Sequence, residues 1–295
     1  MMGAAGAASD EIKYVDDVFS TFLYDGNSGS QSINNGIDLA GEGGLVWLKC
    51  RTNTERHSLQ DTERGVNLLL DSGDTIPQSS ITSVNAFNSN GFSLNSSNGI
   101  FNETGQDYVS WTFRKAPGFF DIVTYTGNGS VQNISHSLGS VPGMIMVKNI
   151  TSTTNWEVYH KFTDCGAPQN YKLELNEIPG RQSNSNVWND TAPTSTQFTV
   201  GTNNSANGNN YVAYIFADAA DSNAQIFGDN GDEGIIYCGM FAGTGFVNLG
   251  WEPQWIMIKP YTQSWNWEVY DNMRGVTTNA AGRALNPNNN NIEAG

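Results

Sequence analysis

The sequence predicts an all-β protein made of tandem antiparallel β-sandwich modules, of which the third is incomplete. Three observations predict this class: short apolar runs with the period of a strand, many turn-forming residues, and the recurrence of the same runs along the chain. The 295 residues include 32 glycines, and charged residues make up only 15%. Aromatic residues make up 11%, which is enough to build cores and argues against a disordered chain.

The first recurring element is a strand-like run that ends in an aromatic residue before a glycine-bearing turn. It covers residues 18–26, 120–127 and 236–243, with Tyr24, Tyr125 and Phe241 as the aromatic residues. Runs of five to eight β-branched and aromatic residues bounded by turn residues are typical of strands. We therefore expect a strand at each of the three places.

A second element follows each copy of the first, over residues 44–49, 143–148 and 254–259. Each copy is apolar and ends in a lysine, at Lys49, Lys148 and Lys259. The regular order of the two elements indicates an internal repeat of roughly 100 to 115 residues, the size of a small domain.

A third element reads Asn-Trp-Glu-Val-Tyr at residues 155–159 and 266–270, and the first copy departs from it. Instead, residues 61–65 (Asp-Thr-Glu-Arg-Gly) match residues 271–275 (Asp-Asn-Met-Arg-Gly). No window of twelve residues has a helical period, so we expect at most a turn or two of helix, near residues 61–70.

A fourth element closes only the first two copies, at residues 108–113 and 211–216. Its alternate residues are apolar: Val109, Trp111 and Phe113, then Val212, Tyr214 and Phe216. Such alternation predicts a sheet with one buried face, and two such sheets would close as an antiparallel sandwich. Because the third copy lacks this element, we expect a neighbouring chain or residues beyond Gly295 to complete it.

These elements divide the chain into four parts. We predict an N-terminal anchor segment at residues 1–17, sandwich modules at 18–116 and 117–228, and a partial module at 229–295. The anchor begins with Gly and Ala, has no strand pattern, and is expected to be ordered by partner chains.

The charge and the cysteines restrict partners and compartment. The net charge is −15, so the chain lacks the basic stripe that a nucleic acid partner requires. The apolar runs are far shorter than the ~20 residues of a membrane span, so no membrane insertion is expected. Three scattered cysteines and no signal peptide suit folding in a reducing cytoplasm.

No pattern in the sequence indicates catalysis or a cofactor. The three histidines, His57, His136 and His160, have no metal-ligand spacing, and no nucleophile elbow occurs. Glu157 and Glu268 occupy equivalent places in two copies, which favours a structural role over a catalytic carboxylate pair. We expect no enzyme activity and no cofactor.

Two sets of residues remain as candidates for binding. Asp229, Asp232 and Glu233 resemble a calcium site only by their density of oxygens, because they lack the spacing of a calcium loop. A solvated loop is the alternative there. The recurring tryptophans suit cores, whereas Trp188, Trp251 and Trp265 do not recur and are candidates for an exposed contact surface.

Taken in order, several segments resemble a known family. They are residues 18–21, 43–49, 61–65, 108–115, 117–121, 125–129, 138–144 and 156–160. The order of these motifs, over roughly residues 16–285, resembles the repeated uncharacterised domain of tail-fibre and other virion structural proteins of marine tailed phages, those of cyanobacteria and SAR11-type bacteria. The resemblance implies a concanavalin-like or jelly-roll sandwich, a place in the virion tail or fibre, and a role in host attachment.

Three functions are compatible with these observations. The first is a phage structural and attachment protein, folded in the host cytoplasm, docked to other virion proteins through its N-terminal segment, and assembled as a homo-oligomer such as a trimer. The second is a lectin-like module that binds a glycan, for instance on a host surface. The third is a polysaccharide depolymerase, which would need a close pair of carboxylates in a groove.

Overall fold

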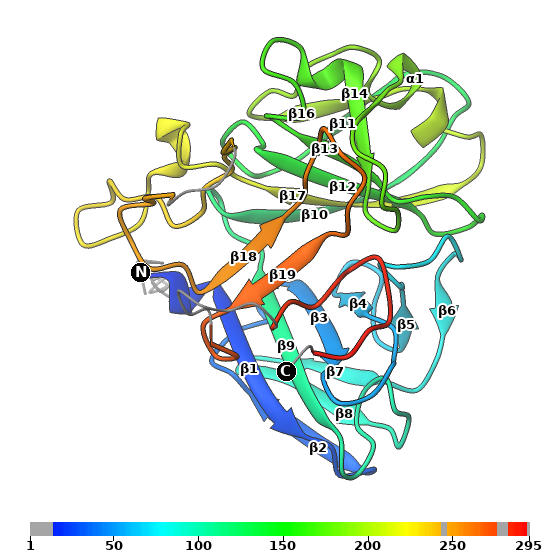
Figure 1. Ribbon diagram of the computed structural model, residues 1–295, viewed down its shortest axis with the longest axis vertical. Helices are drawn as coiled ribbons and strands as arrows, with labels where there is room; N and C mark the ends of the chain where they lie inside the picture. The colour runs from blue at the N-terminus through cyan, green and yellow to red at the C-terminus, as the bar shows by residue number, and fades with distance from the viewer. Residues whose placement is uncertain (1–13, 243–246, 276–282, 294–295) are drawn as a thin grey trace, which may run out of the picture.

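The computed structural model describes residues 14–242, 247–275 and 283–293, and every strand pair in it is antiparallel (Figure 1). The described helices are all short: α1 (Ser185–Trp188) and the 3-10 turns η1 (Val15–Asp17), η2 (Pro168–Asn170), η3 (Thr202–Asn204) and η4 (Ser222–Ala224). None of these helices is long and apolar enough to cross a bilayer. The predicted all-β class is confirmed. Residues 61–70, where at most a turn or two of helix is expected, contain strand ends joined by turns.

Residues 19–114 form two facing sheets. The first sheet has the order β1 (Phe19–Asp25), β9 (Asp107–Arg114), β3 (Gly44–Cys50) and β4 (Ser58–Asp61). The sheet that faces it has the order β2 (Ser30–Asn34), β8 (Gly91–Asn95) and β7 (Val84–Asn88), and β5 (Leu68–Leu69) pairs with β6 (Ser79–Ser80) beside them. Together they form an antiparallel sandwich.

The following residues repeat this pairing. The second sheet has the order β10 (Phe120–Thr126), β17 (Asn210–Phe216), β12 (Met144–Asn149), β13 (Glu157–His160), β14 (Tyr171–Glu174) and β15 (Gln182–Ser183). A two-stranded ladder of β11 (Gln132–Ser135) and β16 (Gln197–Val200) accompanies it. In both sheets the strand that closes the copy lies between the first and the second recurring elements (Figure 1). Superposition of residues 18–116 on 117–228 stays a prediction.

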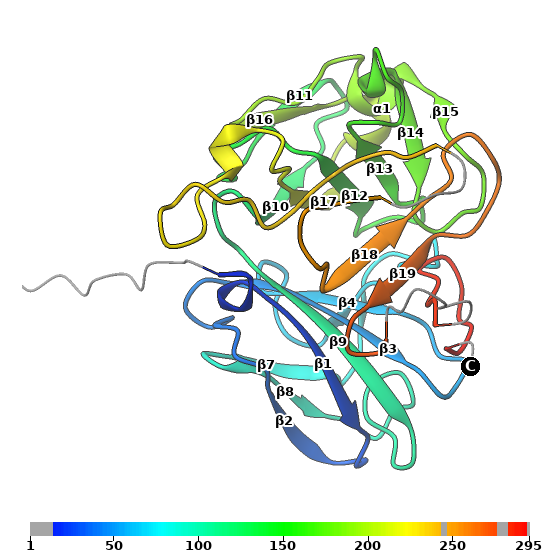
Figure 2. The ribbon, with the colours of Figure 1, turned by 60° about the vertical axis from the view of Figure 1, so that its left-hand side comes forward.

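The third segment, residues 229–295, contributes only β18 (Trp255–Ile258) and β19 (Glu268–Asp271). These two strands lie between the two larger sheets (Figure 2). The strand expected at residues 236–243 does not form over the described residues 236–242, and residue 243 lies outside the described part. In the two larger sheets this element pairs with the closing strand, and among the described residues of the third segment no strand pairs with residues 236–242.

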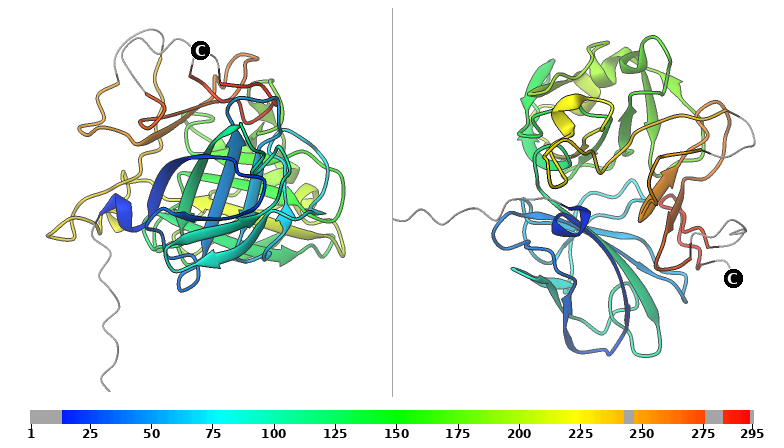
Figure 3. Two further views of the ribbon diagram at one scale, coloured as in Figure 1. Left: turned by 90° about the horizontal axis from the view of Figure 1, so that it is seen from below. Right: turned by 90° about the vertical axis from the view of Figure 1, so that its left-hand side faces the viewer.

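The buried faces differ from the expectation of one buried and one solvated face. Within β9, Tyr108 packs in the interior of the first sandwich, whereas Trp111 packs in a second cluster that all three sheets share. We call this shared set the central cluster; it includes Val109, Trp111, Phe113, Val212, Tyr214, Phe216, Trp267 and Val269. The alternation therefore identifies the face between sheets, and the sandwich interior lies on the opposite face. Figure 3 shows the arrangement of the sheets from two further sides.

Candidate contact surface

Buried ion pairs lie at matching places in the first sheet and in the third segment. Arg64 Nε donates to Asp61 Oδ2 at 2.5 Å, and Arg274 Nε donates to Asp271 Oδ2 at 2.6 Å. All four side chains are at most 1% exposed. Removing one partner of such a pair leaves an uncompensated buried charge, which costs several kcal/mol.

Each ion pair also binds an aromatic side chain from another sheet. The Tyr214 hydroxyl donates to Asp61 Oδ2 at 2.7 Å, and the Trp111 indole Nε1 donates to Asp271 Oδ2 at 2.9 Å. The guanidinium of Arg274 also lies 5.5 Å from the centre of the Trp111 ring. These contacts join the three sheets through the central cluster and leave the carboxylates fully engaged.

Two more tryptophans cross between sheets in the same manner. Trp156 Nε1 donates to the carbonyl of Asp71 at 2.8 Å, and Trp267 Nε1 donates to the carbonyl of Glu174 at 2.8 Å. A buried indole N–H is stabilised when it finds such a partner. The recurring tryptophans are therefore core residues, as the sequence predicted.

A lysine bridges two carboxylates in the second sheet. Lys172 Nζ donates to Glu157 Oε1 at 3.0 Å and to Glu174 Oε1 at 2.6 Å, and all three side chains are largely buried. Burial raises the pKa of Glu157 to about 7. Burial opposes the fall in the pKa of Glu174, but hydrogen bonds from Lys172 and two amide side chains prevail and lower it. This arrangement places no carboxylate in a groove.

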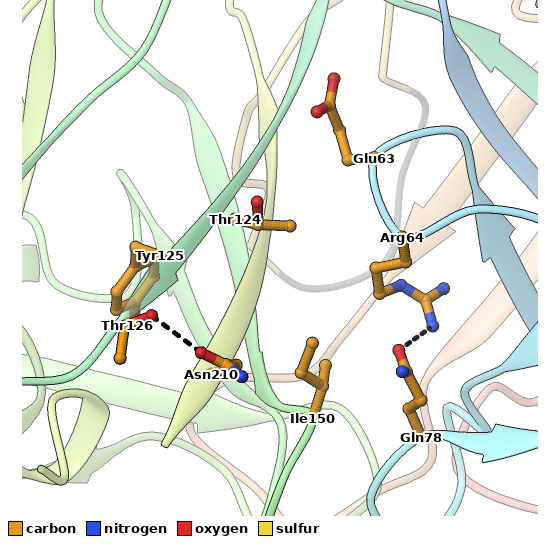
Figure 4. A pocket seen from close by; sticks show the side chains of 8 residues that line it. All are labelled: Glu63, Arg64, Gln78, Thr124, Tyr125, Thr126, Ile150 and Asn210. Atoms are coloured by element: carbon orange, nitrogen blue, oxygen red, sulfur yellow. Dashed lines mark hydrogen bonds between the residues drawn. The ribbon is translucent and has the colours of Figure 1, made fainter. Parts of the chain in front are cut away.

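A surface pocket of about 310 Å³ lies between the first and second sheets (Figure 4). Its lining includes Glu63, Arg64 and Gln78 from one side and Thr126 and Asn210 from the other. Arg64 Nη1 lies 3.4 Å from Gln78 Oε1, and the Thr126 hydroxyl donates to Asn210 Oδ1 at 2.8 Å, so these polar groups are mostly paired with one another. The pocket is an open seam between sheets.

The structure does not assemble the calcium candidate. Asp229, Asp232 and Glu233 are exposed, Asp229 accepts a 2.6 Å hydrogen bond from Tyr14, and Glu233 pairs through its backbone with Phe227. Across residues 14–242, 247–275 and 283–293, no group of three or more His, Cys, Asp or Glu residues is placed to hold a metal. The backbone pairing of Phe227 with Glu233 closes this loop, and its three acids are exposed.

The three candidate contact tryptophans lie in different environments. Trp188 is only 2% exposed and packs edge-on against Tyr159, so its place at a contact surface was predicted wrongly. It does not recur because the short helix α1 that carries it has no counterpart in the first sandwich. Trp251 and Trp265 are 44% and 59% exposed.

Exposed apolar side chains concentrate in the third segment. Of the fifteen large hydrophobic residues exposed in the described part of the chain, eight lie there: Tyr237, Met240, Phe241, Val247, Trp251, Trp265, Met273 and Ile292. We call this set the apolar surface. Isolated exposed apolar residues are ordinary, but more than half of these residues come from the shortest of the three segments. The predicted anchor falls on residues 1–17, of which 1–13 lie outside the described residues.

Sequence reasoning missed the Asp–Arg pairs as the junctions between sheets. The signal was present, because the Asp-x-x-Arg-Gly motif occurs at both 61–65 and 271–275. What the sequence could not supply was the partner of each pair, since Tyr214 and Asp61 are 153 residues apart.

Comparison with known proteins assigns the chain to a family whose description names no function. No curated protein and no solved structure matches the chain. The family model described as a domain of unknown function, DUF7483, matches residues 15–295, which is nearly the whole chain. The chain therefore belongs to the DUF7483 family.

Proposed function

We propose that this chain is a structural and attachment protein of a tailed phage particle, placed in the tail or a fibre, and that it acts through contact surfaces. The observation that carries the proposal is the apolar surface of the third segment. A protein that functions by contact needs exposed apolar surface, whereas a catalytic protein needs a pocket with converging polar groups.

Two further features support the proposal. The ion pairs and tryptophans of the central cluster tie distant parts of the chain into one body, which suits a component that transmits mechanical load. The order of sequence motifs resembles the repeated domain of phage tail-fibre proteins. Symmetric homo-oligomers, commonly trimers in fibres, follow from this proposal, as does docking to other virion proteins through residues 1–17.

The test is to locate the chain in the particle. An antibody raised against the purified chain should label the tail or fibre of purified virions in electron micrographs. The label should persist after the particles are washed at high salt. Virions that contain no copy of the chain, as judged by mass spectrometry, would overturn the proposal.

A lectin-like function is the second candidate, because Trp251 and Trp265 are exposed and an aromatic ring can stack on a sugar. A glycan array distinguishes the two functions. Binding of one glycan class, lost on replacement of either tryptophan, together with absence from virions, would favour the lectin.

A further inference from the structure

Strand β18 has a hydrogen-bonded partner along only one edge. It pairs with β19 over Trp255–Ile258, and no other described strand joins this ladder. The strands that match β18, namely β3 and β12, each lie between two partners, β4 and β9 or β13 and β17. We call the edge of β18 away from β19 the free edge.

The three strands match in hydrogen-bond phase as well as in sequence. The amide of Thr62 donates to Gly44 O at 3.1 Å, that of Lys161 to Gly143 O at 2.9 Å, and that of Asn272 to Gln254 O at 3.1 Å. Hydrogen-bonded pairs alternate along an antiparallel ladder. The backbone groups of Trp255 and Met257 therefore face the free edge.

The same positions in the larger sheets face the closing strands. Leu45 and Trp47 are opposite Phe113 and Trp111, while Met144 and Met146 are opposite Phe216 and Tyr214. Both closing strands place a valine and two aromatic residues at alternate positions in the central cluster. No described strand with this alternating pattern lies along the free edge of β18.

From this geometry we propose that the free edge binds one extended strand, antiparallel to β18, with the alternating pattern Val-x-(Trp or Tyr)-x-Phe. This choice of occupant rests on the two closing strands, β9 and β17. They hold this pattern beside β3 and β12, and their side chains pack in the same central cluster as Trp255 and Met257 of β18. Strand addition at an exposed edge is a recurrent mode of peptide recognition. The inference does not depend on a place in a virion.

The added strand accounts for the irregular backbone of residues 236–242. Strands β1 and β10 each pair with a closing strand and with no other described strand. Residues 236–242 hold the matching place in the sequence of the third segment. Their backbone bonds only to Ala219, through Ile236 O, and to the Asp218 side chain, through Cys238 N, in the interactions found among the described residues. The added strand would supply the ladder. The exposed side chains of Tyr237 and Phe241 would gain a sheet to lie on.

One side chain of β18 agrees with a missing neighbour, and the order of the copies indicates a second position. The indole Nε1 of Trp255 is buried without a hydrogen-bond partner. In the two closing strands that are present, the central aromatic residue donates to a carboxylate of another copy: Tyr214 to Asp61, and Trp111 to Asp271. In the second sheet, His160 holds the sequence position that matches these two aspartates. His160 is only partly buried, whereas Asp61 and Asp271 are fully buried. The central side chain of the added strand therefore lies opposite His160.

The experiment uses the full chain and a synthetic peptide with the sequence of residues 107–114. The control peptide exchanges each inward residue (Val, Trp and Phe) with the residue that follows it, so that composition is kept and phase is shifted. Titration calorimetry should give one site with a dissociation constant on the order of 10 μM for the in-phase peptide. The shifted peptide should bind at least about tenfold more weakly, because its apolar side chains face away from the central cluster.

Hydrogen exchange measured by NMR locates the binding. The in-phase peptide should slow exchange at the amides of Trp255 and Met257 and within residues 236–242. The variant Met257→Pro removes an amide at the free edge without touching the pairing with β19, so it should weaken binding by at least about tenfold. If this variant fails to fold, the comparison of the two peptides still decides.

Three results with the peptides would overturn the proposal. They are equal binding of the two peptides, no binding of the in-phase peptide at millimolar concentration, and slowed exchange elsewhere with no change at Trp255 and Met257. A dimer of the chain that pairs β18 with β18 of a second copy, and that the peptide does not dissociate, would also overturn it.

Discussion

The indole Nε1 of Trp111 donates a 2.9 Å hydrogen bond to the Asp271 carboxylate, 160 residues further along the chain. The ring belongs to the first sheet and the carboxylate to the third segment, so this bond fixes β19 against β9. Both side chains are buried, and Asp271 is also paired with Arg274. A buried hydrogen bond to a charged acceptor contributes about 1.5–3 kcal/mol.

Trp111→Phe is therefore expected to destabilise the chain more than Trp188→Phe does. Both changes remove similar ring volume from a buried site, but the Nε1 of Trp188 has no hydrogen-bond partner to lose. The difference should be about 1–2 kcal/mol, since Arg274 still pairs with the carboxylate in the variant. Urea denaturation followed by circular dichroism measures it. Equal midpoints for the two variants would show that the bond between the sheets adds nothing.

The pH dependence of stability should change when Glu157 is replaced by Gln. Burial raises the pKa of this carboxyl from 4.5 to about 7 in the folded protein. Between these values the folded state holds a proton that the unfolded state has released, so the contribution of Glu157 falls as pH rises from 4.5 to 7. Wild-type protein should therefore lose stability relative to Glu157→Gln across this window.

Glu174→Gln is the matched control with the opposite sign. Because the folded pKa of Glu174 is lowered, its contribution is present above its ordinary pKa of 4.5 and is lost as pH falls through the folded value. Thermal melts of the three proteins from about pH 2 to 8 give both slopes, because the Glu174 contribution changes below pH 4.5. A parallel pH profile for wild type and Glu157→Gln would contradict the buried, protonated state of Glu157.

Gly127→Ala should be strongly destabilising because the backbone of another loop fills the space beside it. A Cβ atom at Gly127 would lie 2.3 Å from the carbonyl oxygen of Ala206, which is too close for any side chain. At Gly166 the nearest contact is 3.7 Å away, so Gly166→Ala is the control. We expect a loss of roughly 2–4 kcal/mol for Gly127→Ala and less than about 0.5 kcal/mol for Gly166→Ala. Similar melting temperatures for the two would contradict the close packing of this turn.

The strands were predictable where local pattern decides, and the packing between sheets was not. The closing strands at 108–113 and 211–216 follow from alternation, and both form β structure. Alternation does not say what covers each face. Trp111 lies on a face shared by three sheets, and only the folded chain brings Asp271 to it.

Residues 236–242 show the limit of local pattern most clearly. Their sequence has the features of a strand, yet a strand needs a neighbour to satisfy its backbone, and the matching strands obtain theirs from the closing strand. Trp188 fails for a related reason. Absence from the repeat indicated a surface residue, but α1 gave it a separate buried place.

The exposed tryptophan Trp251 provides the most direct test of the apolar surface. Trp251→Ser should change the free energy of unfolding by less than about 0.5 kcal/mol, because the side chain is 44% exposed and belongs to none of the buried clusters. Ile76→Ser is the control, since Ile76 is exposed to a similar extent but lies in the first sandwich. If the third segment is the contact surface, Trp251→Ser should lower the amount of chain that co-sediments with virions or host cells at least about threefold, whereas Ile76→Ser should leave it unchanged. Equal losses for both variants would indicate nonspecific hydrophobic adsorption. No loss for Trp251→Ser would show that Trp251 is not part of the contact surface.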